Sequence, residues 1–242
     1  SSQVSDLSRL LKAGAITEET IRKDQAKGTM NLRRIVASAD GLQMSNEEVP
    51  AKRHYSNTLY NVMRGGVFYN HYLIDRADFR LFVKQASRSV FRAYEQWIDG
   101  LPVTLRLNDL AGRTKELNDS DMERILREYL PLTFSRRHGD PSRPWNRFAI
   151  ENRNPDGSTR LSYEGNWRDI FQNWEALSFS FPGFLEGMIS KFLNASGADG
   201  YNPYRITREG IDWEVPDPAE PWAFIGYWGD HQIIYLQKFL EM

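Results

Sequence analysis

The stretch "YEGNWRDIFQNWEAL", Tyr163 to Leu177, decides how this sequence is expected to fold. On a helix that begins at Trp167, large apolar side chains form one stripe and short polar side chains form a second stripe. The apolar stripe contains Ile170, Phe171, Trp174 and Leu177, and the polar stripe contains Asp169, Gln172 and Asn173. A solvent-exposed stripe more often carries Lys and Glu. We therefore predict a helix that packs on one side and faces a polar, ligand-sized cavity on the other.

Further helices are expected on both sides of this stretch. Apolar periodicity and end signals predict them at 5–14, 17–28, 56–66, 75–100, 119–131, 182–196 and 230–242. Thr17 is expected to cap the second of these helices, Gly28 to end it, and Ser120 with Glu123 to form a capping box. The alternation in "VTLRLN" predicts a short strand, and Pro155-Asp156-Gly157 predicts the turn of a hairpin over 147–163. The fold class is therefore mainly α with one inserted β-hairpin.

Composition excludes several classes of function. The formal net charge of −1 over 242 residues offers no basic stripe for a nucleic acid. The absence of cysteine excludes disulfides, thiolate metal sites and a cysteine nucleophile, and it fits a cytoplasmic location. The four histidines share no short ligand spacing, so neither a metal nor a cofactor is expected. No apolar run is long enough to span a membrane, and no signal peptide is visible at the N-terminus.

Aromatic residues make up 13% of the chain, and six of the seven tryptophans follow residue 140. Large side chains fill large cores, which explains such a content without any ligand. Aromatic rings beside polar groups also suit sugars, which present an apolar C–H face and a polar rim. Composition alone leaves both explanations open.

The nine residues "GNWRDIFQN", Gly165 to Asn173, resemble the "G-F-R-D-x-x-Q-D" motif of the cellobiose-phosphorylase group of sugar phosphorylases. That group belongs to the (α/α)6-barrel carbohydrate-active enzymes, which include glucoamylase-like glycosidases. The sequence departs from the motif at Trp167 and Asn173. The resemblance implies an (α/α) toroid in which Arg168 and Asp169 hold a sugar. A complete barrel has more helices than are predicted here, and the last helix runs to Met242 without a cap, so the chain is expected to be one helical domain, 1–242, that covers part of a barrel.

Other polar groups have both a structural and a functional explanation. Asp140, Arg143 and Trp145 share an irregular loop, where they either bind a ligand or form a turn and an ion pair. Asp169 is either a sugar ligand or a helix-start residue favoured by the helix dipole. Asp230 is either a helix cap or a group that reaches a ligand.

A glycosidic bond needs a proton donor at the leaving oxygen, and hydrolysis needs a second carboxylate, whereas phosphorolysis uses phosphate as the attacking group. The candidate proton donors are Asp212, Glu214 and Asp230, and desolvation by Trp213 would raise the pKa of either of the two carboxyls beside it. The residues expected to hold the sugar are Arg168, Asp169, Gln172, Asn173, Trp167, Trp145, Asp140, Arg143, Tyr201 and Arg205.

The predicted function is the hydrolysis or phosphorolysis of a glycosidic bond in a disaccharide or oligosaccharide, with phosphate as a second substrate in the latter case. Two alternatives remain open. The chain is a non-catalytic carbohydrate-binding or scaffolding module, or it is an inactive fragment of a larger glycosidase-like protein.

Overall fold

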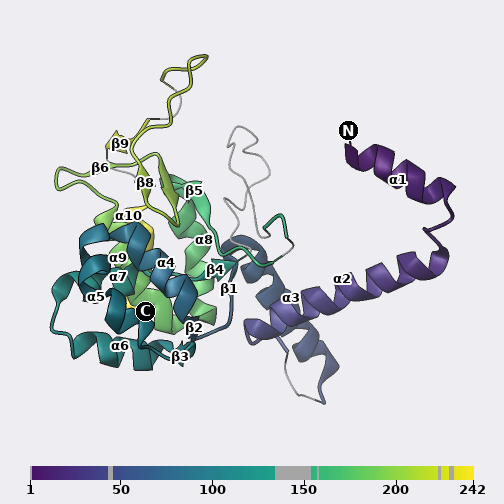
Figure 1. Ribbon diagram of the computed structural model, residues 1–242, viewed down its shortest axis with the longest axis horizontal. Coiled ribbons are helices and arrows are strands. Elements are labelled where there is room, and N and C mark those ends of the chain that lie inside the picture. The colour runs from purple at the N-terminus through teal and green to yellow at the C-terminus, as the bar shows by residue number, and fades with distance from the viewer. Residues whose placement is uncertain (1, 43–45, 134–153, 157, 223–224, 229–231) are drawn as a thin grey trace.

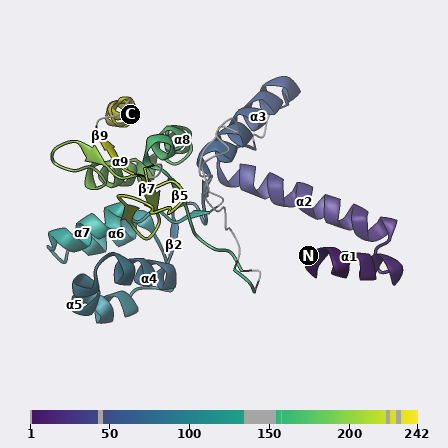
Figure 2. The ribbon, with the colours of Figure 1, turned by 90° about the horizontal axis from the view of Figure 1, so that it is seen from above.

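The computed structural model describes residues 2–42, 46–133, 154–156, 158–222, 225–228 and 232–242. Within these ranges the chain forms ten α-helices, a single 3-10 helix and four small antiparallel sheets, so the mainly α fold class is confirmed. The N-terminal helices form an arm that extends away from a body made by the later helices (Figure 1). The view from above shows the same separation (Figure 2).

The arm contains α1 (Ser2–Lys12) and α2 (Glu18–Ser38), and α3 (Glu48–Gly65) joins it to the body, where α3 packs against α8. Thr17 caps α2 as predicted, because its hydroxyl accepts a hydrogen bond from the Thr20 amide. The expected end at Gly28 is wrong, since α2 continues through it for ten more residues. A glycine inside a helix costs only about 1 kcal/mol relative to alanine, and the long run of helix-forming residues around Gly28 outweighs that cost.

The segment 75–100 was expected to form one helix, and this expectation is wrong. It forms α4 (Arg76–Ala86) and α5 (Arg88–Asp99), which pack against each other. Ser87 separates them with φ −153° and ψ 114°, and its hydroxyl caps α5 by accepting from the Val90 amide. Serine competes with helical backbone in this way. The reversal packs the apolar stripes of both helices into the core.

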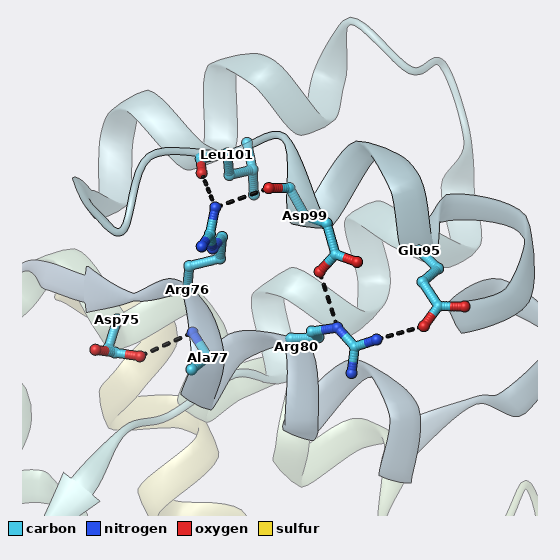
Figure 3. Close-up of polar contacts among 7 residues, drawn as sticks. All are labelled: Asp75, Arg76, Ala77, Arg80, Glu95, Asp99 and Leu101. Atoms are coloured by element: carbon cyan, nitrogen blue, oxygen red, sulfur yellow. Dashed lines mark hydrogen bonds and ion pairs between the residues drawn. The ribbon is translucent and has the colours of Figure 1, made fainter.

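Two arginines of α4 close the reversal (Figure 3). Arg76 donates to the backbone carbonyls of Asp99 and Leu101, at 2.7 Å each, and so places a cation at the C-terminal end of α5. Arg80 pairs with the Asp99 carboxylate at 2.9 Å and with Glu95. Every polar group drawn in this hairpin therefore has a structural partner.

The strands are short and pair mainly elements that are distant in sequence. β1 (Val67–Phe68) pairs with β4 (Leu132–Thr133), and β2 (Leu73–Asp75) pairs with β3 (Thr104–Arg106), which confirms the strand predicted from "VTLRLN". β5 (Glu164–Asn166), β7 (Arg205–Thr207) and β8 (Ile211–Asp212) form one sheet, and β6 (Tyr201–Asn202) pairs with β9 (Tyr227–Trp228). The turn predicted at Pro155 is present, with the Asn154 amide donating to the Ser158 carbonyl at 2.9 Å. Residues 147–153 of the expected hairpin lie outside the described residues.

The remaining helices of the body are α6 (Leu107–Lys115), α7 (Ser120–Glu128), α8 (Trp167–Ser180), η1 (Pro182–Phe184), α9 (Leu185–Asn194) and α10 (Ile233–Glu241). Asp119, and not Ser120, caps α7, because its carboxylate accepts from the Met122 amide. Helix α8 packs against α3, α9 and α10. Its apolar stripe is buried as predicted, with Ile170, Phe171 and Trp174 fully covered.

Candidate functional site

The start of α8 is surrounded by polar side chains from three other segments. β5 leads directly into the helix, so Asn166 immediately precedes Trp167. The Trp167 amide donates to the Tyr204 carbonyl at 3.0 Å, which ties the first turn of α8 to the segment before β7. β9 approaches from the other side, where Tyr227 lies against the Trp167 ring with 6.2 Å between ring centroids. Residues distant in sequence thus meet at this helix end.

Asn166 links two of these segments through its amide. The Tyr227 hydroxyl donates to Asn166 Oδ1 at 2.7 Å. Burial raises the pKa of Tyr204, a hydrogen bond from the Asn166 amide and the positive charge of Arg205 lower it, and the negative charge of Asp169 raises it. The net effect is a raised pKa, so Tyr204 is a neutral phenol at ordinary pH. Asp169, Asn166, Tyr204 and Tyr227 form what we call the α8 polar cluster.

The polar stripe of α8 is largely buried. The exposed fraction is 6% for Asp169 and 3% for Asn173, while Gln172 is half-buried. The Asn173 carbonyl faces α3 so closely that a Cβ atom on Gly65 would lie 2.7 Å from it. The Asn173 Nδ2 atom has no hydrogen-bond partner within the described part of the protein. The side chain of Arg168 lies outside the described residues.

Trp167 does not lie on a surface where a sugar ring could stack. It is buried and packs against Phe171, Phe192 and Tyr227, with ring centroids 5.7, 5.0 and 6.2 Å away. The physical reason is the start of α8 at this residue, which turns the indole toward α9. Trp167 therefore belongs to the core.

Arg205 forms ion pairs between two strands. It contacts Glu164 of β5 at 2.8 Å and Asp212 of β8 at 2.7 Å, which ties together the three strands of that sheet. Burial alone would lower the pKa of Arg205, but the hydrogen bonds and charges of Asp212 and Glu164 outweigh this effect and raise the pKa. Arg205 and Asp212, predicted as sugar ligand and proton donor, thus bind each other.

The other predicted residues are dispersed. Glu214 is exposed, so Trp213 does not bury its carboxyl, and its backbone forms a bridge with Ile225. Tyr201 stacks on Trp213, with centroids 5.8 Å apart and 16° between the ring planes. Asp140, Arg143, Trp145 and Asp230 lie outside the described residues.

A pocket of about 320 Å³ lies between α6, α7, η1 and α9. Its size is at the lower end of the range of small-molecule sites, roughly 300–1,000 Å³. Leu107, Leu126 and Phe184 supply apolar walls, and the charged lining residues are Lys115, Glu123, Arg127 and Glu186. Thr114 also lines it, and its buried hydroxyl has no hydrogen-bond partner among the described residues. None of the predicted sugar-binding residues lines this pocket, so it is not the cavity expected beside α8.

Sequence reasoning missed Asn166, Tyr204 and Tyr227. Asn166 lies inside the quoted stretch, two residues before Arg168, so its position was a usable signal. The two tyrosines could not be found from spacing, because strand pairing in a long loop brings them to α8. Sequence reasoning also missed Arg208, whose guanidinium is buried and binds both carboxylate oxygens of Asp78 at 2.7 Å.

The described residues contain neither a metal-ligand cluster nor a membrane-spanning helix. They contain no group of three or more His, Cys, Asp or Glu side chains placed to hold a metal ion. Of the helices in these ranges, none has both the length and the apolar character needed to cross a bilayer.

Residues 68–131 match the family model of glycoside hydrolase family 149 insertion domain 1. The matched segment runs from β1 through α7 and covers about a quarter of the chain. This similarity relates the chain to a family of glycoside hydrolases. A search of curated proteins found no match to the chain.

Proposed function

We propose that the chain is part of a carbohydrate-active enzyme of the (α/α)-toroid type, 1–242 forming one helical domain, and that the start of α8 binds a sugar. The reaction is cleavage of a glycosidic bond by hydrolysis or phosphorolysis, in the cytoplasm. The observation that carries the proposal is the burial of Asp169 in the first turn of α8, where its negative charge raises the pKa of Tyr204. The glycoside hydrolase similarity of residues 68–131 supports the choice of substrate class.

The α8 polar cluster has the groups that a sugar requires. A carboxylate accepts hydrogen bonds from hydroxyls, and amide and phenol groups both donate and accept them. Buried, directed polar groups give a small-molecule site its specificity. In this proposal Arg168 and Asp169 hold the sugar, with Gln172 and Asn173 placed along the same stripe of the helix. Trp167 has no part in stacking because it is buried.

Of the three candidate proton donors, Asp212 and Glu214 lie among the described residues and Asp230 lies outside them. A general acid has to reach the leaving oxygen and release its proton there. Asp212 is held by Arg205, and Glu214 is exposed, so both are weaker candidates than at the outset. Asp230 is therefore our preferred candidate on its place in the sequence, because it comes two residues after β9, whose Tyr227 binds Asn166.

Ligand-dependent thermal stabilisation tests this proposal. We expect glucose, mannose, galactose, cellobiose or maltose to raise the melting temperature of the chain, since a ligand that binds the folded state stabilises it. Asp169→Asn removes the charge with little change of shape and should abolish the increase. Asp121→Asn is the matched control, because Asp121 lies in the first turn of α7 and is exposed. An unchanged response in Asp169→Asn would contradict the proposal. Repeating the titration with inorganic phosphate separates phosphorolysis, where phosphate should add to the effect, from hydrolysis.

A second candidate is a non-catalytic binding or scaffolding role. The match is to an insertion domain, and eight of the twelve residues that line the 320 Å³ pocket lie within residues 68–131. If this role is correct, a small ligand should stabilise the protein in a manner that depends on Thr114 and Arg127 and not on Asp169. A chain that responds to no sugar at all favours the inactive-fragment alternative.

A further inference from the structure

Three aromatic rings meet on an exposed surface of the β6–β9 sheet. Tyr201 of β6 lies between Trp213, which follows β8, and Trp228 of β9. The Tyr201 and Trp228 centroids are 5.0 Å apart with 59° between their planes. We call these three residues the aromatic ledge. Trp213 is 42% exposed and Trp228 is 65% exposed, so the ledge presents large indole surfaces to solvent.

The sheet separates the ledge from the α8 polar cluster. Tyr201 pairs with Trp228, and Asn202 pairs with Tyr227. Successive strand residues point to opposite faces. Asn202 is buried and Tyr227 reaches Asn166, so this pair faces α8, while Tyr201 and Trp228 lie on the other face. The ledge is therefore a neighbour of the proposed sugar site and not a part of it.

The backbone around Tyr201 holds its ring in place. A Cβ atom on Gly226 would lie 3.0 Å from two atoms of the Tyr201 ring and 2.2 Å from the Asn202 carbonyl oxygen. The ring thus lies directly on the glycine that precedes β9. On its N-terminal side, the Tyr201 amide donates to the Asp199 carboxylate at 3.1 Å, and the Gly197 amide donates to the Tyr201 carbonyl at 2.7 Å. A ring fixed in this way loses little conformational entropy when a ligand binds.

The charges near the ledge favour a neutral ligand. Residues 197–228 contain six acidic residues, two arginines and no lysine. Arg205 is paired with Asp212 and Glu164, and Arg208 is paired with Asp78. Aromatic platforms for single-stranded nucleic acids lie in positively charged grooves. Here the excess charge is negative, which disfavours polyanions and leaves flat, neutral, hydroxyl-rich rings as the best match.

We propose that the aromatic ledge is a docking surface for a neutral oligosaccharide, whose pyranose rings stack on Trp213 and Trp228. This inference rests on the proposed function for its ligand class. An exposed cluster of large apolar side chains marks an interaction site. The ledge is a binding surface separate from the α8 polar cluster, and a longer glycan covers more of its two indole rings, so affinity increases with chain length.

Isothermal titration of the whole chain with cellohexaose, maltohexaose, laminarihexaose and mannohexaose tests the ledge. We expect at least one hexasaccharide to bind, and Trp213→Ala and Trp228→Ala to weaken that binding about tenfold each, or ~1.4 kcal/mol. Trp222→Ala is the matched control, since Trp222 is 84% exposed in the same loop. Its affinity should stay within about twofold of the parent. Circular dichroism checks that each variant is folded.

Two results would contradict the proposal that the aromatic ledge binds an oligosaccharide. The first is that no hexasaccharide binds, and the second is that Trp222→Ala weakens binding as much as Trp213→Ala and Trp228→Ala do. The disaccharide response of Asp169→Asn distinguishes a failure of the ledge proposal from a failure of the proposed function. If hexasaccharide binding depends on Trp228 while disaccharides give no response that depends on Asp169, the ledge stands and the sugar site at α8 does not. If disaccharides require Asp169 but Trp213 and Trp228 contribute nothing to hexasaccharide affinity, the opposite holds.

Discussion

Helices α4 and α8 both carry an arginine and an aspartate in their first turn, but the surroundings of these residues differ. "DRAD" at Asp75–Asp78 begins α4, and "WRDI" at Trp167–Ile170 begins α8. At α4 the polar groups hold the structure together: Asp75 accepts from the Ala77 and Asp78 amides, Arg76 binds carbonyls at the end of α5, and Asp78 binds Tyr129 and Arg208. At α8 the aspartate is buried, and its negative charge acts on Tyr204 from a segment distant in sequence.

The difference teaches that an Arg-Asp pair at a helix start does not indicate a ligand by itself. What distinguishes α8 is its surroundings, because β9 and the segment before β7 bring the side chains of Tyr227 and Tyr204 to its start. At α4 the partners are backbone amides, helix-end carbonyls, the Tyr129 hydroxyl and the Arg208 guanidinium, and they complete the bonding of each side chain. Substitutions at the two helices should therefore have different effects. Those at α4 should lower the stability of the protein, and those at α8 should remove its response to a ligand.

The largest expected effect is at Asp78. Asp78→Ala leaves the guanidinium of Arg208 buried without its partner, and breaking a buried ion pair in this way costs about 3–5 kcal/mol. Urea unfolding should show this loss. The double variant Asp78→Leu with Arg208→Met removes both charges and should recover a large part of the stability. A loss of stability below about 1 kcal/mol for Asp78→Ala would mean that the Asp78–Arg208 ion pair does not hold residues 68–131 to the rest of the body.

Tyr129→Phe should have the next largest effect. The Tyr129 hydroxyl donates to Asp78 at 2.5 Å, and a hydrogen bond to a charged group contributes about 1.5–3 kcal/mol.

The same substitution makes a prediction about pH. Burial, followed by the charge of Asp78, raises the pKa of Tyr129 well above its ordinary value of 10.0. A raised folded pKa gives stability that is present below the unfolded pKa and is lost as pH rises above it. Stability should therefore fall above about pH 10, and less steeply in Tyr129→Phe than in the parent protein. Equal slopes in urea midpoints measured on both sides of pH 10 would contradict this assignment.

Arg205→Ala should cost about 1 kcal/mol, because its two ion pairs are partly exposed and solvent screens them. If Arg205 only joins strands, Asp212→Asn should cost a similar amount and leave any sugar response unchanged. A loss of sugar response in Asp212→Asn, with stability intact, would instead show that Asp212 takes part in sugar binding.

Arg80→Ala should have the smallest effect, a few tenths of a kcal/mol, because its pairs with Glu95 and Asp99 lie at the surface and are weakened by salt. The urea midpoints of Arg80→Ala and of the parent protein, measured at low and at high salt, check this prediction, and the difference between them should be smaller at high salt. A loss comparable to that of Asp78→Ala would show that surface pairs hold the α4–α5 hairpin.

The sequence was sufficient for elements that depend on local signals. The α8 stripe, the Thr17 cap and the β3 strand follow from periodicity, capping chemistry and alternation. The reversal at Ser87 was missed, because one serine inside a strong apolar period carries little weight until the two helices fold back on each other. The meeting of Asn166, Tyr204 and Tyr227 depends on strand pairing between distant segments, and no local pattern encodes it. The burial of Trp167 was missed for a similar reason, since α9 supplies the covering surface.

The most direct test of the central claim is the change in melting temperature of the parent chain and of Asp169→Asn when a disaccharide is added, with Asp121→Asn as the control. The start of α8, as we describe it, predicts an increase for the parent and for Asp121→Asn and none for Asp169→Asn. The same increase in all three proteins would show that Asp169 takes no part in binding, and it would contradict the claim.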